Sequence, residues 1–131
     1  MKNVLDLMIV DDNVRARQAL TAYLSLQPGI RVTAQAANGQ EAIQLIRDRQ
    51  PDMVLMDMQM PVMDGLEATK IIKKRWPGVK IIVLTMYPSY QSETMLVGAE
   101  AFLVKGSPNE ELVATIHTLI PIELITCYQP V

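Results

Sequence analysis

Short apolar runs alternate with longer stretches in which apolar residues recur at helical spacing, and the alternation repeats five times along the chain. No internal repeat or low-complexity linker interrupts this pattern. Each apolar run is bounded by turn residues or by a charged residue. The pattern predicts five strands: Leu5–Val10, Ile30–Ala36, Met53–Met56, Val79–Leu84 and Ala101–Val104.

Four of these runs are apolar almost without a break, as expected of parallel strands that helices cover on both faces. The second run has Arg31 and Thr33 between apolar neighbours, which predicts an edge strand with one wetter face. Five βα units imply right-handed crossovers and a doubly wound α/β domain with five helices. We expect the flavodoxin-like form of this domain, with the strand order 2-1-3-4-5. In such a domain the ligand site is expected at the carboxyl ends of the central strands.

Three of the helices are each predicted by one apolar stripe: Ala16, Leu20, Tyr23 and Leu24 in the first, Ala42, Ile43 and Ile46 in the second, and Ala68, Ile71 and Ile72 in the third. Asn38 and Asp64 are expected to cap the second and third helices. The last helix has a clear start signal, because Ser107 begins a capping box and Pro108 suits the first helical position. The fourth helix, somewhere in Tyr90–Val97, has the weakest pattern.

The composition is that of one folded domain. With 131 residues, half of them apolar and a fifth charged, the chain can bury a core without disulfides or a structural metal. The net charge of −2 gives no electrostatic reason to expect DNA, RNA or an anionic membrane as a direct ligand of this segment. The single cysteine, Cys127, has no partner for a disulfide or a zinc site, and no apolar run has the length of a membrane span. We therefore expect a cytoplasmic protein.

Polar residues follow four of the predicted strands. They are Asp11 and Asp12 after the first strand, Asp57 after the third, Thr85 after the fourth and Lys105 after the fifth. If the strand order is 2-1-3-4-5, these strands lie side by side and bring the five residues to one edge of the sheet. A single polar residue at a strand end is usually only solvated, whereas five together predict a phosphoryl-transfer site.

Three clustered carboxylates would repel one another and raise their own pKa values unless cations were present. A divalent ion together with Lys105 would balance them, and Mg²⁺ is expected because it prefers oxygen ligands and retains several waters. Asp57 is the candidate nucleophile toward phosphorus, as carboxylates are in aspartyl-phosphate intermediates. Lys105 and the Thr85 hydroxyl would stabilise the oxygens of the transferred group.

The same residues lie in motifs by which the chain, over about residues 4 to 120, resembles the receiver domains of two-component response regulators. The motifs are "MIVDDN" with the acidic pair, "VLMDMQMPVMDGLE" around Asp57, "IIVLTM" ending beside Thr85, and "GAEAFLVKGS" with Lys105. Within the family, "LTMY" and "AFLVKGSPNEEL" are most similar to the subgroup whose receivers precede a LuxR-type helix-turn-helix domain.

The resemblance implies a Mg²⁺ site made of oxygen ligands: Asp12, Asp57, the backbone carbonyl of Gln59 and, through water, Asp11. It also implies that a phosphohistidine on a sensor histidine kinase phosphorylates Asp57. Thr85 and Lys105 would bind the phosphoryl group. The domain is then a phosphoacceptor that catalyses its own phosphorylation and dephosphorylation, and is not a turnover enzyme.

Phe102 lies three places before Lys105, at the position of the aromatic switch residue in the family. When the Thr85 hydroxyl is drawn toward the phosphoryl group, it leaves space into which this ring can turn. The fourth helix, fifth strand and fifth helix would then change their surface. The resemblance therefore implies a switch in partner binding or self-association, with a homodimer as one phosphorylated form.

We expect a receiver domain over residues 1–120 and a tail over 121–131. The tail is too short for a helix-turn-helix motif and has no basic residue, so transcription would be regulated only if the full protein has a DNA-binding output domain elsewhere. Two positions depart from the family. Gly106 stands where many receivers have proline, and Met86 stands where a small residue is common and could narrow access to Asp57.

The main alternative is an aspartate-dependent phosphatase of the haloacid-dehalogenase type, which also uses a strand-end aspartate and Mg²⁺. Gln59 argues against it, because such enzymes have a second aspartate there as general acid. A nucleotide-binding module is also disfavoured, since no glycine-rich phosphate motif follows any strand. His117, the only histidine, is expected to be a surface side chain.

Overall fold

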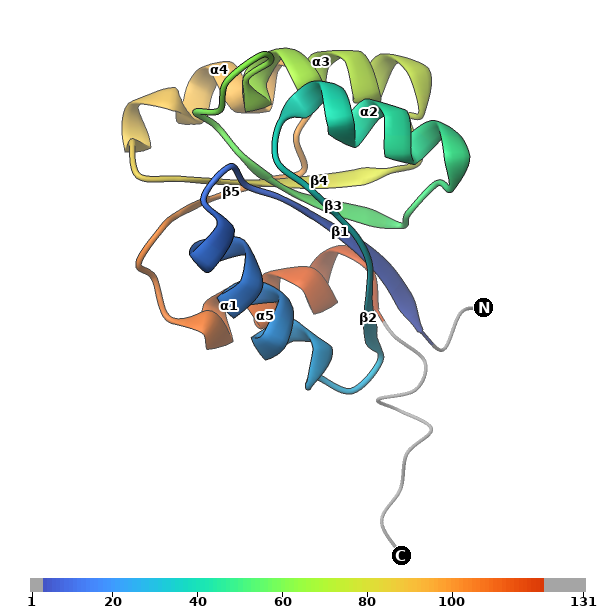
Figure 1. The fold of residues 1–131 in the computed structure, drawn as a ribbon. Helices are drawn as coiled ribbons and strands as arrows, with labels where there is room; N and C mark the ends of the chain where they lie inside the picture. Colours follow the sequence, from blue (N-terminus) through green and yellow to red (C-terminus); the bar gives the residue numbers. More distant parts are fainter. Residues whose placement is uncertain (1–3, 122–131) are drawn as a thin grey trace, which may run out of the picture.

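A five-stranded parallel sheet forms the centre of the computed structural model, which describes residues 4–121 (Figure 1). Its strands are β1 (Leu5–Val10), β2 (Ile30–Ala36), β3 (Met53–Asp57), β4 (Lys80–Thr85) and β5 (Ala101–Val104). They lie in the order β2-β1-β3-β4-β5, and every neighbouring pair is parallel. The predicted strand order is therefore confirmed, with β3 extended to include Asp57 and β4 shifted by one residue.

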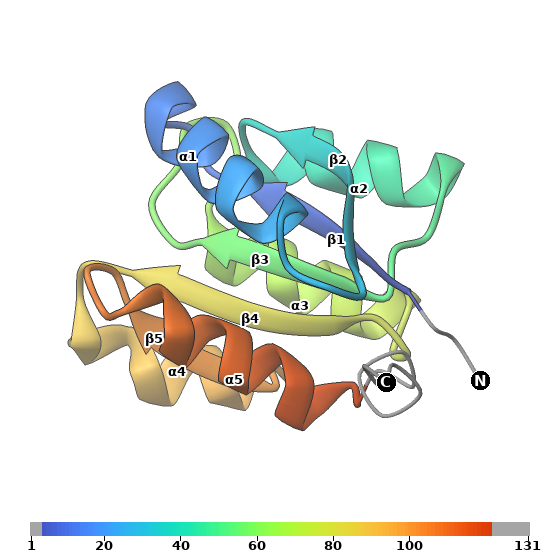
Figure 2. The same cartoon turned by 90° about the horizontal axis from the view of Figure 1, so that it is seen from below.

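Helices cover both faces of the sheet. They are α1 (Val14–Ser25), α2 (Gly39–Asp48), α3 (Gly65–Arg75), α4 (Gln91–Leu96) and α5 (Asn109–Leu119), and a short 3-10 turn, η1 (Pro88–Tyr90), precedes α4. Helices α1 and α5 lie on one face, and α2, α3 and α4 lie on the other (Figures 1 and 2). The helix with the weakest sequence pattern, α4, is also the shortest. None of the helices within residues 4–121 is long and apolar enough to cross a membrane.

Alternate residues of the central strands enter two separate cores. In β1, Met8 and Val10 pack toward α2 and α3, whereas Leu7 and Ile9 pack toward α1 and α5. Burial on both faces explains why these strands are apolar without alternation. The edge strand β5 is different, because all four of its residues are only half-buried although its sequence is as apolar as that of the central strands.

Side-chain caps shape the turns that lead into the first three helices. Asn38 accepts a hydrogen bond from the backbone N–H of Glu41, and Asp64 accepts one from that of Glu67, both at 2.9 Å, so both predicted caps are confirmed. The predicted capping box of the last helix is wrong. The Ser107 hydroxyl donates to the Val104 carbonyl oxygen, and Pro108 is itself the N-cap without a side-chain bond. Ser107 therefore closes the turn after β5 instead of starting the helix.

Gly65 sits where the start of α3 touches the end of β3. Its N–H donates to the Met58 carbonyl oxygen at 2.8 Å, and a Cβ at Gly65 would collide with the Asp57 carbonyl oxygen. Only glycine permits this approach. The contact links the position of α3 directly to the residue that ends β3.

We predict that Gly65→Ala lowers the unfolding free energy by about 1–3 kcal/mol, because either the loop after β3 or the start of α3 must move. Urea unfolding of the variant and wild type measures the difference. Gly78→Ala is the matched control, since a Cβ at Gly78 meets no atom within 4 Å, and its unfolding free energy should stay within about 0.5 kcal/mol of wild type. Equal stability of the two variants would contradict the steric argument.

Candidate functional site

Three carboxylates meet at the carboxyl ends of β1 and β3, on the left of the view in Figure 1. Asp11 and Asp12 follow β1 directly, and Asp57 is the last residue of β3. One oxygen from each of these side chains lies within 4.8 Å of the others. The convergence that the sequence predicted for the acidic residues is thus present in the structure.

Lys105, which follows β5, forms ion pairs with two of these carboxylates. Its Nζ lies 3.0 Å from Asp11 Oδ2 and 3.2 Å from Asp57 Oδ2. The lysine follows β5 directly, and its backbone N–H donates to the Thr85 carbonyl oxygen at 2.8 Å, which extends the β4–β5 pairing by one step. The ammonium group is therefore held over the acidic cluster by the sheet itself.

Backbone donors satisfy the other oxygens of the same two carboxylates. Asp57 Oδ1 accepts from the Met58 N–H at 2.8 Å, and Asp11 Oδ1 accepts from the Asn13 N–H at 2.9 Å. The Arg17 guanidinium donates to the backbone carbonyl of Asp11. Arg17 was missed by the sequence reasoning, and its place four residues after the helix cap Asn13 was the only available signal.

The site keeps Asp57 partly out of water. Its residue is 9% exposed, and burial raises the pKa of the Asp57 carboxyl to about 6, with Lys105 opposing the rise and the charge of Asp11 adding to it. Burial would lower the pKa of Lys105, but its hydrogen bonds to Asp11 and Asp57 and their charges outweigh burial and raise it. Lys105 thus stays protonated, and the pKa of Asp57 stays raised because burial outweighs the attraction to Lys105.

Thr85 ends β4 one position beyond the residue that pairs with Asp57. Its side chain is buried, at 1% exposed, and its hydroxyl oxygen accepts from the Tyr87 N–H at 3.2 Å. Phe102 in β5 pairs with Val83 in β4. Side chains alternate along a strand, so Val83 and Thr85 point to the same face, and Phe102 shares that face, which α4 covers. Phe102 is half-buried against the core on that face.

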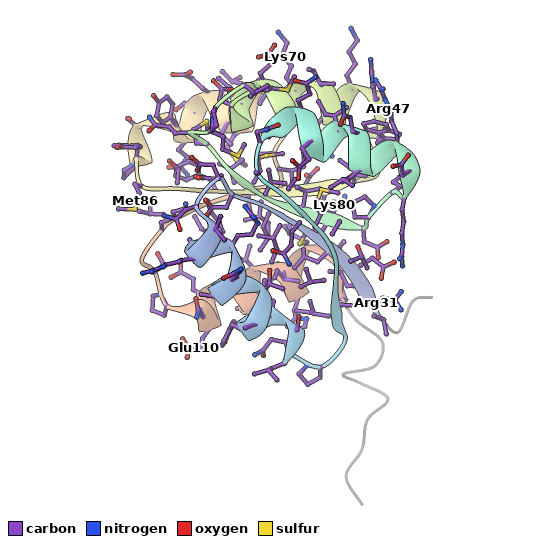
Figure 3. The ribbon with its side chains drawn as sticks, viewed as in Figure 1. Arg31, Arg47, Lys70, Lys80, Met86 and Glu110 are labelled. Atoms are coloured by element: carbon purple, nitrogen blue, oxygen red, sulfur yellow. The ribbon has the colours of Figure 1, made fainter. Side chains whose placement is uncertain are left out.

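The remaining singled-out residues lie further from the cluster or point outward. Gln59 is exposed in the loop after β3, and its role as a ligand stays a prediction. Met86 is 63% exposed and projects from the site edge of the molecule (Figure 3). The prediction for His117 is wrong in part, because the residue is half-buried, its Nδ1 is buried without a partner in residues 4–121, and burial lowers its pKa.

The donor set fits a hard divalent cation. Three carboxylates supply oxygen ligands within a few ångströms of one another, and one ammonium group cannot neutralise them. Mg²⁺ is characteristically held by one or two carboxylates with water completing the shell. With Thr85 and Lys105 beside it, the cluster has the components to bind a cation and a phosphoryl group together.

The chain matches known proteins along most of its length. A family model for the response regulator receiver domain matches residues 7–117. The chain is 38% identical over 113 residues to an uncharacterized transcriptional regulatory protein, YhcZ, of Bacillus subtilis, covering 85% of this chain and 53% of YhcZ. It is 31% identical over 120 residues to the transcriptional regulatory protein DegU of Brevibacillus brevis, covering 90% of this chain and 51% of DegU. The chain thus spans about half the length of these curated relatives.

Solved structures match as well. A DNA-binding response regulator of the LuxR family from Staphylococcus aureus superposes with a TM-score of 0.84 at 31% identity, covering 88% of this chain and 98% of that one. The response regulator protein TrrA from Thermotoga maritima, solved in complex with Mg²⁺ and BeF, gives 0.81 at 31% identity, covering 92% and 100%. From its fold, its acidic cluster and these matches, the chain belongs to the response regulator receiver domains of two-component phosphorelay signalling.

Proposed function

We propose that Asp57 is the phosphoacceptor of this domain, and that a phosphohistidine on a sensor histidine kinase is the donor. The observation that carries the proposal is the Lys105 ammonium group 3.2 Å from the Asp57 carboxylate, at the strand ends where three carboxylates converge. An incoming phosphoryl group needs cationic charge at the acceptor oxygen, and a lysine fixed by the sheet supplies it without reorganisation.

Asp12, Asp57 and the backbone carbonyl of Gln59 would hold Mg²⁺, with Asp11 acting through water. The acidic cluster and the Mg²⁺–BeF complex of the related TrrA protein support this assignment. When bound, the ion would neutralise negative charge on the phosphoryl oxygens and on the carboxylates. It would also favour the ionised form of Asp57, whose pKa burial otherwise raises to about 6.

The transfer itself needs no general base. The N–P bond of phosphohistidine breaks as a bond forms between phosphorus and an Asp57 oxygen, and the imidazole leaves with the electron pair of the broken bond. Above a pH of about 6 the Asp57 carboxylate is already ionised and has no proton to lose. Lys105 and the Thr85 hydroxyl would receive the oxygens of the transferred group, with the Tyr87 N–H holding the Thr85 oxygen in place beforehand.

Receiver domains generally act as signalling domains and not as enzymes, and the phosphatase alternative is not favoured. The self-catalysed phosphorylation and dephosphorylation of this domain are part of the proposal. They follow from the same electrostatics, since a small phosphoryl donor would meet the same cations that a kinase donor meets. Gln59 offers no carboxylic acid two residues after Asp57 to protonate a leaving alcohol.

The response would be carried by Thr85 and Phe102, which share one face of the sheet. Phe102 is half-buried, so it has both a packed neighbour and a route to solvent. A shift of the Thr85 hydroxyl toward the phosphoryl group would favour an inward ring and remodel the surface of α4, β5 and α5. That surface would then bind a partner or a second copy of the chain.

The match covers only about half of the length of the relatives named as transcriptional regulators. We propose that the full protein regulates transcription through an output domain and works in the cytoplasm, where sensor kinases are charged from ATP. The described domain, with its net charge of −2, would not itself bind DNA or membrane. The domain boundary at residue 120 stays a prediction, and the predicted tail lies, from residue 122 on, outside the described residues.

Incubation with acetyl phosphate and Mg²⁺ should add one base-labile phosphoryl group at Asp57, because the site supplies the electrostatics without a kinase. Asp57→Asn should abolish the addition, and chelation of Mg²⁺ should suppress it. Intact-mass and peptide mass spectrometry measure both results. Location of the group on Thr85 or Ser107, or full modification of Asp57→Asn, would refute the assignment of Asp57.

We expect Phe102→Ala to accept phosphate at Asp57 but to lose most of the phosphorylation-dependent change in self-association, since the ring that fills the space behind Thr85 is gone. Sedimentation with and without beryllium fluoride and Mg²⁺ measures the change. Leu103→Ala is the control, because Leu103 is the next residue of β5 but packs on the opposite face, toward α5. A full response in a folded Phe102→Ala variant would show that the ring is only a core residue.

A further inference from the structure

A groove with a volume of about 340 Å³ lies between α2 and α3, on the side of the sheet away from α1 and α5. Its walls are mainly apolar and come from Ile43 in α2, Ile71 in α3 and Met63 in the preceding loop. Arg47 and Arg75 line the same groove from the last turns of the two helices. The groove therefore has a mainly apolar lining, the apolar floor, and one arginine from each of its two helices.

The side chains of both arginines lack a partner in the described part of the chain. Within residues 4–121, the guanidinium groups of Arg47 and Arg75 make no ion pair or hydrogen bond, whereas the cations elsewhere that do pair are bound to Asp6, Asp11, Asp57 or Glu100. Lys70 and Lys74 on α3 are also exposed and unpaired in this part of the chain, and Figure 3 shows Lys70 and Arg47 projecting outward from the α2–α3 layer. The chain as a whole has a net charge of −2, whereas these four cationic side chains gather on the α2–α3 face.

We propose that the α2–α3 groove binds an acidic amphipathic peptide segment of a partner protein. Apolar side chains of the segment would bury against Ile43, Met63 and Ile71, and flanking carboxylates would pair with the two guanidinium groups. Arginine suits this role, because its planar fork binds a carboxylate through two hydrogen bonds. A helix presenting one apolar stripe is the usual occupant of a groove between two helices.

The apolar floor favours an acidic peptide over other anionic ligands. Phosphates of a nucleic acid would be attracted to the two arginines, but their binding affinity would not increase through contact with the apolar side chains of Ile43 and Ile71. An anionic membrane would call for an apolar face that projects from the surface, and this one is recessed between two helices. A peptide with both apolar and acidic side chains uses every feature of the groove.

The groove is separate from the phosphoacceptor site but adjoins the loop that leaves it. Met63 belongs to the segment between Asp57 and α3, and its carbonyl oxygen accepts from the Gly39 N–H at 3.1 Å, which ties this segment to the start of α2. None of Ile71, Arg47 and Arg75 touches the acidic cluster. Variants at these three positions can therefore test the groove without altering the chemistry at Asp57.

The test begins with a phage-displayed library of random peptides about 15 residues long, a length that can form a helix on binding. Peptides selected on the wild-type domain are labelled, their affinities are measured by fluorescence anisotropy, and their sites are mapped by amide chemical shifts. We expect peptides with apolar stripes and flanking Asp or Glu, with shifts centred on α2 and α3. The Arg47→Glu/Arg75→Glu double variant should bind them at least about tenfold more weakly.

Two further variants separate charge from packing. Arg47→Glu alone is compared with Arg15→Glu, an identical charge change at an exposed arginine of α1 on the opposite face, which should alter affinity by less than about twofold. Ile71→Gln should weaken binding although all charges remain. Each variant must give a wild-type amide spectrum and must still take up beryllium fluoride with Mg²⁺ to the wild-type extent, which separates this proposal from the assignment of Asp57.

The proposal is overturned if no selected peptide depends on Arg47 and Arg75, or if the shifts lie on α1, α4 or α5. It is also overturned if a single-stranded oligonucleotide or an anionic phosphatidylserine vesicle binds through the two arginines without any effect of Ile71→Gln. That pattern would identify a purely electrostatic surface for nucleic acid or lipid.

Discussion

Burial of the Asp57 carboxylate beside Asp11, Asp12 and a single ammonium group is the constraint on which the rest of this structure depends. Lys105 bridges Asp11 and Asp57 at 3.0 and 3.2 Å, yet the pKa of Asp57 remains raised to about 6 because burial outweighs the attraction. Left to itself, the chain would keep such groups apart in water. The fold nevertheless holds the three carboxylates together. One ammonium group leaves the cluster with a net negative charge, which a bound cation would neutralise.

Several local features act on that one edge of the sheet. The parallel register sets Asp57 beside Leu84 and Thr85 beside Val104, and Lys105 continues the pairing by one backbone hydrogen bond. Gly65 lets α3 begin against the backbone of Asp57. At the opposite edge, Arg31 pairs with the buried Asp6, so ion pairs brace both ends of β1. The central strands are a fixed support, whereas the half-buried β5 and the six-residue α4 leave the proposed response surface less tightly packed.

The strands and the five converging residues were predictable from the sequence. Unbroken apolar runs mark the strands, and the polar residues that follow four of these runs mark the ends of those strands. Parallel strands must end at the same edge, so the sequence position of Asp57 or Lys105 already implies its neighbours. The start of α5 was not predictable in the same way. The spacing of Ser107 and Glu110 fits a capping box, but the Ser107 hydroxyl instead donates to the Val104 carbonyl oxygen, in the turn that contains Gly106 with its φ of 94°.

Other features depend on which side chains find partners after folding. The hydrogen bond from Arg17 to the Asp11 carbonyl and the buried Nδ1 of His117 depend on packing between helices and strands, which residue spacing does not describe. The same holds for Arg47 and Arg75. In the sequence they are ordinary surface cations near helix ends, and only the structure places both on one apolar groove without a partner.

The central claim is that the fold keeps an ionised Asp57 at a cost in stability. Because its pKa rises from 3.8 to about 6, the folded state binds the proton more tightly than the unfolded state, so stability should increase as pH falls through about 6 and the gain should be complete below 3.8. The most direct test is the unfolding free energy of wild type and Asp57→Asn from pH 8 to pH 4 without divalent ions. We predict that Asp57→Asn is more stable by about 1–3 kcal/mol at pH 8 and that the difference shrinks toward zero near pH 4. Equal stability at pH 8, or a wild type more stable than Asp57→Asn there, would contradict the account.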